Sequence, residues 1–465
     1  MQDDAPLQEQ PGDDGPALPM AKRTLAGIAW VYAAFVVEKL STLVTTAVLT
    51  RILVPEQFGI IASAMLVIGL LSTFRDLGVP ESVIYFKDRP EETNNTSFWL
   101  HFAIGTTLSL LLFLTAPFIA GFLNDDKTLA PILQAMSPAL LFGAFGFTHV
   151  ALLQKHLMFA RRASVDFLTA IFKAALTIFL AFKGWDVWAI VVGYVFGSIF
   201  RTAALWLAIP FRPRLLFSGE RAREMLHYGK HIFGEGLISN IVNYADQIAI
   251  VVLFGSETLA YYFVAARIPE LVIYQIAIVL TTVLFPTISS FREKPGAIQQ
   301  FVVEATRFLS YAIYPAALGL AVTAPALLET IFGSNWTASA PYVVILALRG
   351  LFATALWIVG DGLKAIGRPD KLFQITLIEA CIAFPLTFIL AIVFNSPLAA
   401  CMGVPIAMLV ANAQRLLEAK RLLAIEPSAF FLASWKSALA AIIMTGCVFA
   451  IEASLTSHAA FVRLA

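Results

Sequence analysis

Ionisable side chains recur inside the long apolar runs of this 465-residue chain. A charged side chain costs about 2.5–3.5 kcal/mol at the centre of a membrane helix, so each must face the bundle interior, water or an opposite charge. The cations are Lys39, Lys173, Arg201, Arg267, Arg307 and Arg349, and the acids are Glu38, Glu235, Asp246, Glu270, Asp361 and Glu379. So many buried charges indicate an interior that handles a charged solute.

Arg201 and Arg349 are the leading candidates for binding an anion, because neither has an acidic residue three or four positions away. Either another helix supplies the counter-ion or a substrate does. Arg267 and Glu270 are three residues apart on one helix face, which predicts an ordinary ion pair unless Arg267 binds substrate. We predict that substrate is bound by a set of five cations, namely Arg201, Arg349, Arg267, Lys173 and Lys39.

The acids offer a second kind of chemistry. Asp246 and Glu235 are eleven residues apart, about three helical turns, and so lie on similar faces of one helix. With Glu38, they are candidates for binding a coupling proton or cation, or for neutralising arginines of the interior. Snorkelling to an interface is the alternative for Lys173.

Motifs of soluble enzymes are absent from the sequence, which has no GxxxxGK[ST], GxGxxG, GxSxG or HExxH. We therefore predict no enzyme activity, no cofactor, no metal site and no nucleic-acid partner. Cys381, Cys401 and Cys447 lie in apolar runs without CxxC spacing, which predicts buried free thiols.

The elements that position these charges are membrane helices. The chain is 59% hydrophobic and 14% charged, against about 25% charged residues in soluble domains. Thirteen apolar runs approach the roughly 20 residues that span a bilayer: 25–50, 57–77, 97–122, 129–153, 164–183, 187–209, 231–254, 258–289, 302–323, 341–363, 371–394, 398–420 and 433–455.

Loop cations predict the orientation of these helices. The loops on the side of the N-terminus hold most of the lysines and arginines, whereas the opposite loops offer only Arg51, Lys127 and Lys183. This asymmetry places the N-terminus in the cytoplasm. Residues 1–19 are acidic and rich in proline and glycine, which predicts a disordered tail.

An internal repeat is visible in the spacing of prolines. Thr115-Ala116-Pro117 and Thr323-Ala324-Pro325 end two predicted helices, and Pro131 and Pro341 begin the helices that follow. We predict an all-α membrane protein with two six-helix lobes, related as a parallel repeat around a central cavity. The N-lobe is residues 20–210, a cytoplasmic linker is 211–230, the C-lobe is 231–422, and 423–465 hold a thirteenth helix and a tail.

Four segments carry a family resemblance, namely TRILVPEQFGIIASA, DLGVPESVIYF, LQKHLMFARRASVDF and YADQIAIVVLFGSETLAYYFVAARIP. In this order they resemble the polysaccharide transporter branch of the multidrug/oligosaccharidyl-lipid/polysaccharide exporter superfamily. Asp246 stands at the acidic position of that family. The match extends from Met20 to about Lys420.

The resemblance implies a flippase in the bacterial inner membrane. It would move undecaprenyl-diphosphate-linked oligosaccharide repeat units from the cytoplasmic to the outer leaflet by alternating access, for exopolysaccharide, capsule or O-antigen synthesis. Its partners would be the lipid-linked oligosaccharide, membrane lipids, a polysaccharide polymerase and a chain-length regulator. A cation-coupled multidrug antiporter of the same superfamily and a membrane polysaccharide polymerase are the alternatives.

Overall fold

The computed structural model describes residues 20–77, 79–86, 88–123, 128–274 and 295–454. Within these ranges the secondary structure is helical and no strand forms, which confirms the all-α class. The predicted tail at 1–19 and the last part of the predicted helix at 258–289 lie outside the described residues.

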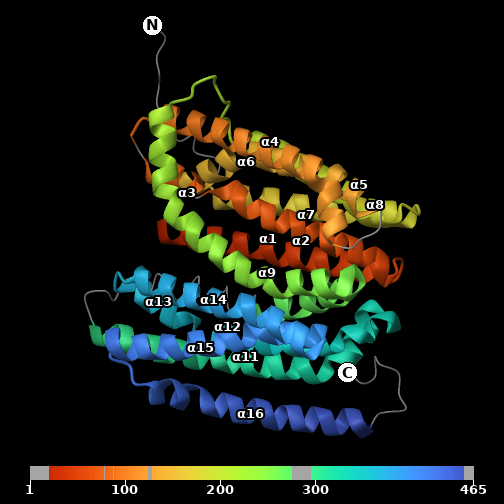
Figure 1. Cartoon of the computed structure of the whole chain (residues 1–465). Coiled ribbons are helices and arrows are strands. Elements are labelled where there is room, and N and C mark those ends of the chain that lie inside the picture. Colours follow the sequence, from red (N-terminus) through yellow and green to blue (C-terminus); the bar gives the residue numbers. More distant parts are fainter. Residues whose placement is uncertain (1–19, 78, 87, 124–127, 275–294, 455–465) are drawn as a thin grey trace.

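Helices of the first half of the chain lie together in the upper part of Figure 1. They are α1 (Met20–Leu49), α2 (Pro55–Asp76), α3 (Val79–Tyr85), α4 (Pro90–Phe122), α5 (Leu129–Met136), α6 (Pro138–Lys155), α7 (Phe159–Phe182) and α8 (Asp186–Ala208). Three of them begin at a proline, whose fixed φ suits the first helical turn and whose missing N–H is not needed there.

Helices of the second half lie together in the lower part of the same view. They are α11 (Pro295–Phe332), the 3₁₀-helix η2 (Ser334–Ser339), α12 (Ala340–Ala355), α13 (Trp357–Ala365), α14 (Pro369–Phe394), α15 (Pro397–Leu422) and α16 (Pro427–Ser454). Between the two groups runs α9 (Gly219–Pro269), which continues into the π-helix η1 (Glu270–Tyr274).

The long helix α9 contains two of the predicted membrane runs. They are separated at Gly255, whose φ of 85° and ψ of 173° only glycine adopts without strain. The first turns of α9, from Gly219, fall within the predicted linker. Eleven segments of the described residues are long and apolar enough to cross a membrane, and α16 supplies the extra C-terminal helix predicted from the sequence.

The prediction that two Thr-Ala-Pro tripeptides end helices was wrong. Both lie inside helices, because α4 continues to Phe122, the predicted end of the run 97–122, and α11 continues to Phe332, beyond its predicted end at 323. In α4, Pro117 leaves the carbonyl of Phe113 without a helical N–H donor, and the side-chain amide of Gln134 donates to it at 3.3 Å. Such replacement donors let membrane helices keep internal prolines.

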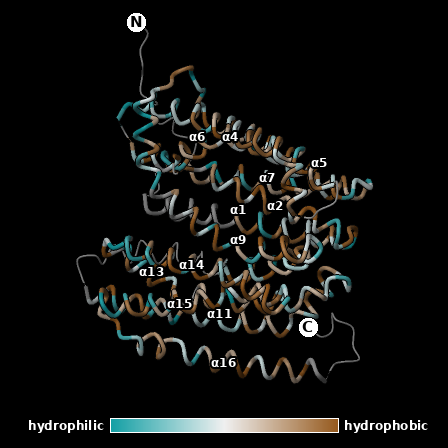
Figure 2. The backbone as a smooth tube through the Cα atoms, in the orientation of Figure 1, coloured by the Kyte–Doolittle hydropathy of each residue, from teal (hydrophilic) through white to brown (hydrophobic). Residues whose placement is uncertain are grey.

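The outer surface is apolar, as a lipid-facing surface must be. Figure 2 shows hydrophobic residues along much of each helix and hydrophilic residues gathered toward helix ends. Large exposed apolar side chains include Leu114, Phe118, Phe182, Leu207, Ile392, Val393, Phe431 and Ile442. Cys381 and Cys447 also lie on this exposed surface, so the prediction that they are buried was wrong, whereas Cys401 is buried and all three are free. The chain is a multi-pass membrane protein.

α9 packs against α12, α14 and α15 and so belongs with the second group of helices. The first group touches it closely along α2. A Cβ added at Gly59 would lie 2.3 Å from the carbonyl oxygen of Ser256, and one added at Gly69 would lie 2.5 Å from the hydroxyl oxygen of Tyr244. Glycine at 59 lets the two helices approach to backbone contact, and glycine at 69 leaves room for the Tyr244 side chain. The internal repeat and the central cavity stay predictions.

A buried tryptophan closes the contact at one end. Trp336 of η2 is fully buried, and its indole Nε1 donates to the carbonyl oxygen of Thr50 at 3.0 Å. Its ring makes edge contacts with Phe58 of α2 and with Tyr261 of α9. The end of α1 and the start of α2 are thereby fastened to the second half of the chain.

Candidate functional site

Two cations of the predicted set share one carboxylate, and a third lies on an adjacent helix. Arg267 of α9 lies with its Nη1 3.5 Å from Oε2 of Glu270, and Lys39 of α1 pairs with Oε1 of the same residue. Lys173 lies on α7, which packs along α1, and Glu38 of α1 is exposed. We call Lys39, Lys173, Arg267, Glu38 and Glu270 the cation cluster; three positive and two negative groups leave it with a formal charge of +1.

The helices explain why these side chains meet. α1 packs against α7, which brings Lys39 and Lys173 to one region, and α1 also touches α9 and α11 of the second half. Glu270 follows Pro269, where α9 gives way to the π-helix η1. π-Helical turns widen the backbone and are frequent at functional sites. The Lys39–Glu270 pair therefore joins the two halves of the chain.

Aromatic rings cover one side of each cation. Measured to the ring centroid, Lys39 lies 5.3 Å from Phe35, Lys173 4.9 Å from Tyr194, and Arg267 4.0 Å from Phe263. The side chains of Lys39 and Arg267 nevertheless remain 24% and 22% exposed. A partly desolvated cation that a solute can still reach is suited to binding an anion.

Arg201 finds its counter-ion on a neighbouring helix. Its Nε and Nη2 lie 3.1 and 3.0 Å from Oδ1 of Asp166 on α7, and Arg162 approaches the other oxygen at 3.7 Å. Sequence reasoning left out Asp166, although its position four residues after Arg162 was a usable signal. Arg75, near the end of the predicted run 57–77, is a further cation outside the predicted set; its guanidinium lies 4.7 Å from the Phe147 ring centroid inside the first half.

Arg349 of α12 lies in a closed network within the second half. Its Nη1 is 2.8 Å from Oδ2 of Asp246 and its Nη2 donates to Oδ1 of Asn243 at 3.1 Å. The hydroxyl of Tyr262 donates to the same Asp246 oxygen at 2.7 Å. The side chains of Asp246 and Arg349 are 0% and 6% exposed, so the pair is sealed from any solute. We call Arg349, Asp246, Asn243 and Tyr262 the Arg349 network.

Two further interior acids, Glu379 and Asp361, are also paired with cations. Glu379 lies 3.4 Å from Nη2 of Arg415, and Asp361 lies 3.9 Å from Nζ of Lys364. Glu235 is in α9, and its side chain lies outside the described residues. Of the acids predicted to bind a coupling ion, Asp246 forms a buried ion pair with Arg349.

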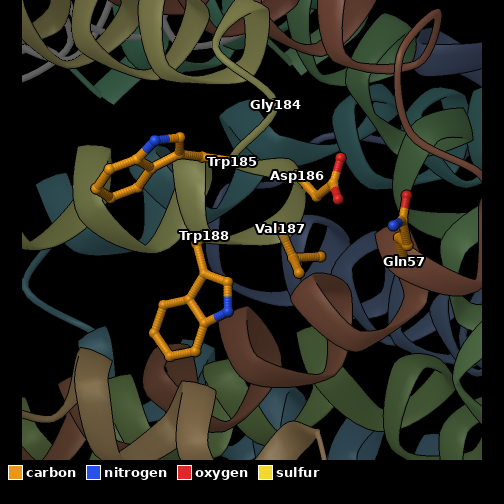
Figure 3. Close-up of a pocket in the computed structure, with 6 residues that line it drawn as sticks. All are labelled: Gln57, Gly184, Trp185, Asp186, Val187 and Trp188. Carbon is orange, nitrogen blue, oxygen red and sulfur yellow. The ribbon is translucent and has the colours of Figure 1, made fainter.

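A surface cavity of about 470 Å³ lies where α2 and α8 begin. Figure 3 shows the Asp186 carboxylate pointing toward Gln57, while the indoles of Trp185 and Trp188 point elsewhere. The two indoles are 49% and 42% exposed, as expected for tryptophans that anchor a helix end at the membrane interface. This cavity is apart from the cation cluster.

Residues 48–341, more than half of the chain, match the family described as "polysaccharide biosynthesis protein". The chain belongs to this family. Among its relatives, the lipopolysaccharide biosynthesis protein WzxC of Escherichia coli (strain K12) is 24% identical over 392 residues. That alignment covers 84% of this chain and 78% of WzxC.

The succinoglycan biosynthesis transport protein ExoT of Rhizobium meliloti (strain 1021) is 25% identical over 338 residues, which cover 72% of this chain and 68% of ExoT. The fold of this family member is similar to that of solved membrane transporters. A lipid II flippase, MurJ, in an inward closed conformation matches with a TM-score of 0.79 and 16% identity, over 93% of this chain and 95% of MurJ. An inward-facing multidrug resistance MATE family transporter matches with a TM-score of 0.63 and 18% identity, over 83% and 94% of the two chains.

Proposed function

We propose that this chain is a flippase that moves undecaprenyl-diphosphate-linked oligosaccharide repeat units from the cytoplasmic to the outer leaflet. The observation that carries the proposal is the cation cluster, to which both halves of a polysaccharide biosynthesis family member contribute. The relatives ExoT and MurJ, a transport protein and a flippase by name, support a transporter rather than an enzyme.

The charge of the cluster suits this cargo. Lys39, Lys173 and Arg267 would hold the diphosphate, and the net charge of +1 would offset the cost of bringing an anion into the membrane. A diphosphate with about two negative charges gains roughly 4.6 kcal/mol per 100 mV when it moves outward, because an inside-negative potential drives anions out. The membrane voltage alone could drive the flip.

We further propose that the N-terminus is cytoplasmic and the membrane is the bacterial inner membrane. In this orientation Thr50 and Trp336 lie at the outer end, and their contact closes the site toward the outside. Alternating access would require that contact to open. A polysaccharide polymerase would accept the flipped repeat units, and a chain-length regulator would act with it.

The multidrug antiporter is the competing function, and the pairing of acids argues against it. An antiporter for organic cations needs a carboxylate that cargo and coupling ion can reach. Asp246 is fully buried against Arg349, and Glu379 is paired with Arg415. The accessible acids of the described interior, Glu38 and Glu270, lie among Lys39, Lys173 and Arg267, so an organic cation would meet a cluster of net positive charge.

The test is leaflet-specific quenching of a fluorescent undecaprenyl-diphosphate oligosaccharide in proteoliposomes, with and without an imposed potential. Lys39→Gln and Arg267→Gln should each slow transport roughly 10- to 100-fold, the effect of losing one charged hydrogen bond. Arg421→Gln is the matched control, because Arg421 lies at the end of α15 with its side chain 71% exposed.

Equal transport by all three variants would remove the cation cluster from the mechanism. Absence of protein-dependent lipid movement, together with proton- or sodium-driven efflux of an organic cation, would assign the chain to the antiporters.

A further inference from the structure

A second interior cavity lies within the second half of the chain. It has a volume of about 320 Å³, is partly open, and is lined by residues of α9, η1, α12, α13, α14 and α15. Its lining is part polar and part apolar, and the polar and aromatic residues include Asn243, Tyr274, Trp357, Asp361, Glu379 and Arg415. Polar groups in a membrane interior are costly unless they bind one another, water or a ligand, so the polar part of such a cavity is suited to water or a polar ligand.

The charges around the cavity cancel. Asp361 lies 3.9 Å from Nζ of Lys364, and Glu379 lies 3.4 Å from Nη2 of Arg415. Two acids and two cations leave no net charge, unlike the cation cluster at +1. The cavity is therefore poorly suited to a diphosphate, which needs excess positive charge, and to an organic cation, which needs excess negative charge.

An uncharged polyhydroxy ring fits this chemistry. Carboxylate oxygens accept hydrogen bonds from hydroxyl groups and the Arg415 guanidinium donates to them. The Nδ2 of Asn243, whose Oδ1 accepts from Arg349, is a further donor. Trp357 adds a flat apolar surface among these polar groups. A volume of about 320 Å³ equals that of roughly ten water molecules at ~30 Å³ each, which is room for one monosaccharide.

The cavity adjoins the cation cluster along one helix. Tyr274, which lines the cavity, is four residues after Glu270. Both residues belong to the five-residue π-helix η1. A ligand whose diphosphate lies at the cluster would thus have its first sugars close to the cavity.

A break in the helix places Trp357 and Asp361 in the cavity wall. The backbone leaves helical geometry at Leu356, with φ −123° and ψ 19°, and α13 restarts at Trp357. Interrupted membrane helices commonly form substrate sites in transporters, because their ends and side chains can face a polar cavity.

We propose that this cavity binds one uncharged monosaccharide of the lipid-linked oligosaccharide and gives the flippase its sugar preference. The inference rests on the proposed function and extends it: the cation cluster binds the diphosphate, and the cavity reads the glycan. Trp357 and Asp361 are the residues that carry the preference.

The experiment measures equilibrium binding of fluorescent lipids to purified protein in detergent. The probes are bare undecaprenyl diphosphate and the same lipid carrying glucose, galactose or N-acetylglucosamine. Wild-type protein should bind at least one glycosylated lipid about tenfold more tightly than the bare lipid. Trp357→Ala and Asp361→Asn should each reduce that preference roughly 3- to 30-fold while binding of the bare lipid stays unchanged.

Two further variants keep the outcome decisive. Ser239→Ala removes a smaller polar group from the same wall and guards against misfolding of the larger changes. Lys39→Gln should weaken binding of every probe equally, including the bare lipid, which tests the cation cluster separately. Failure of Lys39→Gln to change any affinity would overturn the proposed function.

Two results would overturn the cavity proposal by itself. One is a wild-type protein that binds bare and glycosylated lipids equally well. The other is a set of cavity variants, each with a wild-type melting temperature, that alter dependence on sodium or pH but leave the sugar preference intact. The second result would identify the cavity as a cation site.

Discussion

Removing Arg349 should destabilise the protein rather than merely empty a substrate site. In Arg349→Met the carboxylate of Asp246 stays fully buried and keeps only the Tyr262 hydroxyl and the backbone N–H of Gln247 as partners. Breaking one side of a buried ion pair costs about 3–5 kcal/mol, because an uncompensated charge is left behind. At about 1.4 kcal/mol per factor of ten, the unfolding equilibrium should shift roughly 10²- to 10⁴-fold.

The assay is thermal unfolding in detergent of Arg349→Met, Asp246→Asn and the double variant. The double variant should regain most of the lost stability, since replacing both charges of a buried pair is often neutral. Arg201→Met is the matched control, because the Arg201–Asp166 pair is partly exposed, with side chains 35% and 26% accessible, and should contribute at most ~1 kcal/mol. The reasoning is refuted if Arg349→Met melts like wild type yet no longer binds the lipid probe, since Arg349 would then contact cargo.

Three further predictions concern the contacts between and around the two halves. Glu270→Gln raises the charge of the cation cluster by one unit and should tighten binding of bare undecaprenyl diphosphate about tenfold, measured by fluorescence anisotropy. Trp336→Ala removes a fully buried ring, a change that costs about 3–5 kcal/mol, and should loosen the contact with Thr50. A single cysteine placed at Thr50 in a cysteine-free background should then react faster with a thiol reagent. An unchanged rate would mean that the outer contact holds without the indole. The Arg221 guanidinium donates to the Asp88 carboxylate and holds the pKa of Asp88 below its ordinary value. The pair therefore stabilises the folded protein at pH values above the pKa that Asp88 has in the unfolded chain, and this stabilisation is lost as the pH falls through the lower pKa of Asp88 in the folded protein. Melting temperatures measured between pH 6 and 3 should therefore fall less in Asp88→Asn than in wild type.

Sequence patterns reached the helices but only part of the site. Apolar run length predicted the membrane spans, because a membrane helix is defined by local composition. Gly255 lies in the gap between two of the predicted runs. The Arg267–Glu270 pair was predictable, since residues three apart on a helix are neighbours. The approach of Lys39 to Glu270, 231 residues away, depends on how helices pack, and no local pattern encodes it.

The same limit explains the two isolated arginines. The sequence left open whether another helix or a substrate supplies their counter-ions, and the structure provides Asp166 for Arg201 and Asp246 for Arg349. Spacing along one helix cannot reveal such partners, because they lie on other helices. Asp166 was overlooked since it lies near a helix start rich in cations, where an acid looks like part of a solvated loop.

Cargo binding and the movement of the two halves meet at one side chain. Lys39 of the first half pairs with Glu270 of the second, and under the proposed function the same ammonium also binds the diphosphate. A ligand shifts a conformational equilibrium only through different affinities for the two states. A diphosphate that competes with Glu270 for Lys39 would weaken a contact made only when the halves are arranged as here, and so favour the other arrangement. Glycan in the neighbouring cavity would hold the cargo to the second half while that exchange takes place.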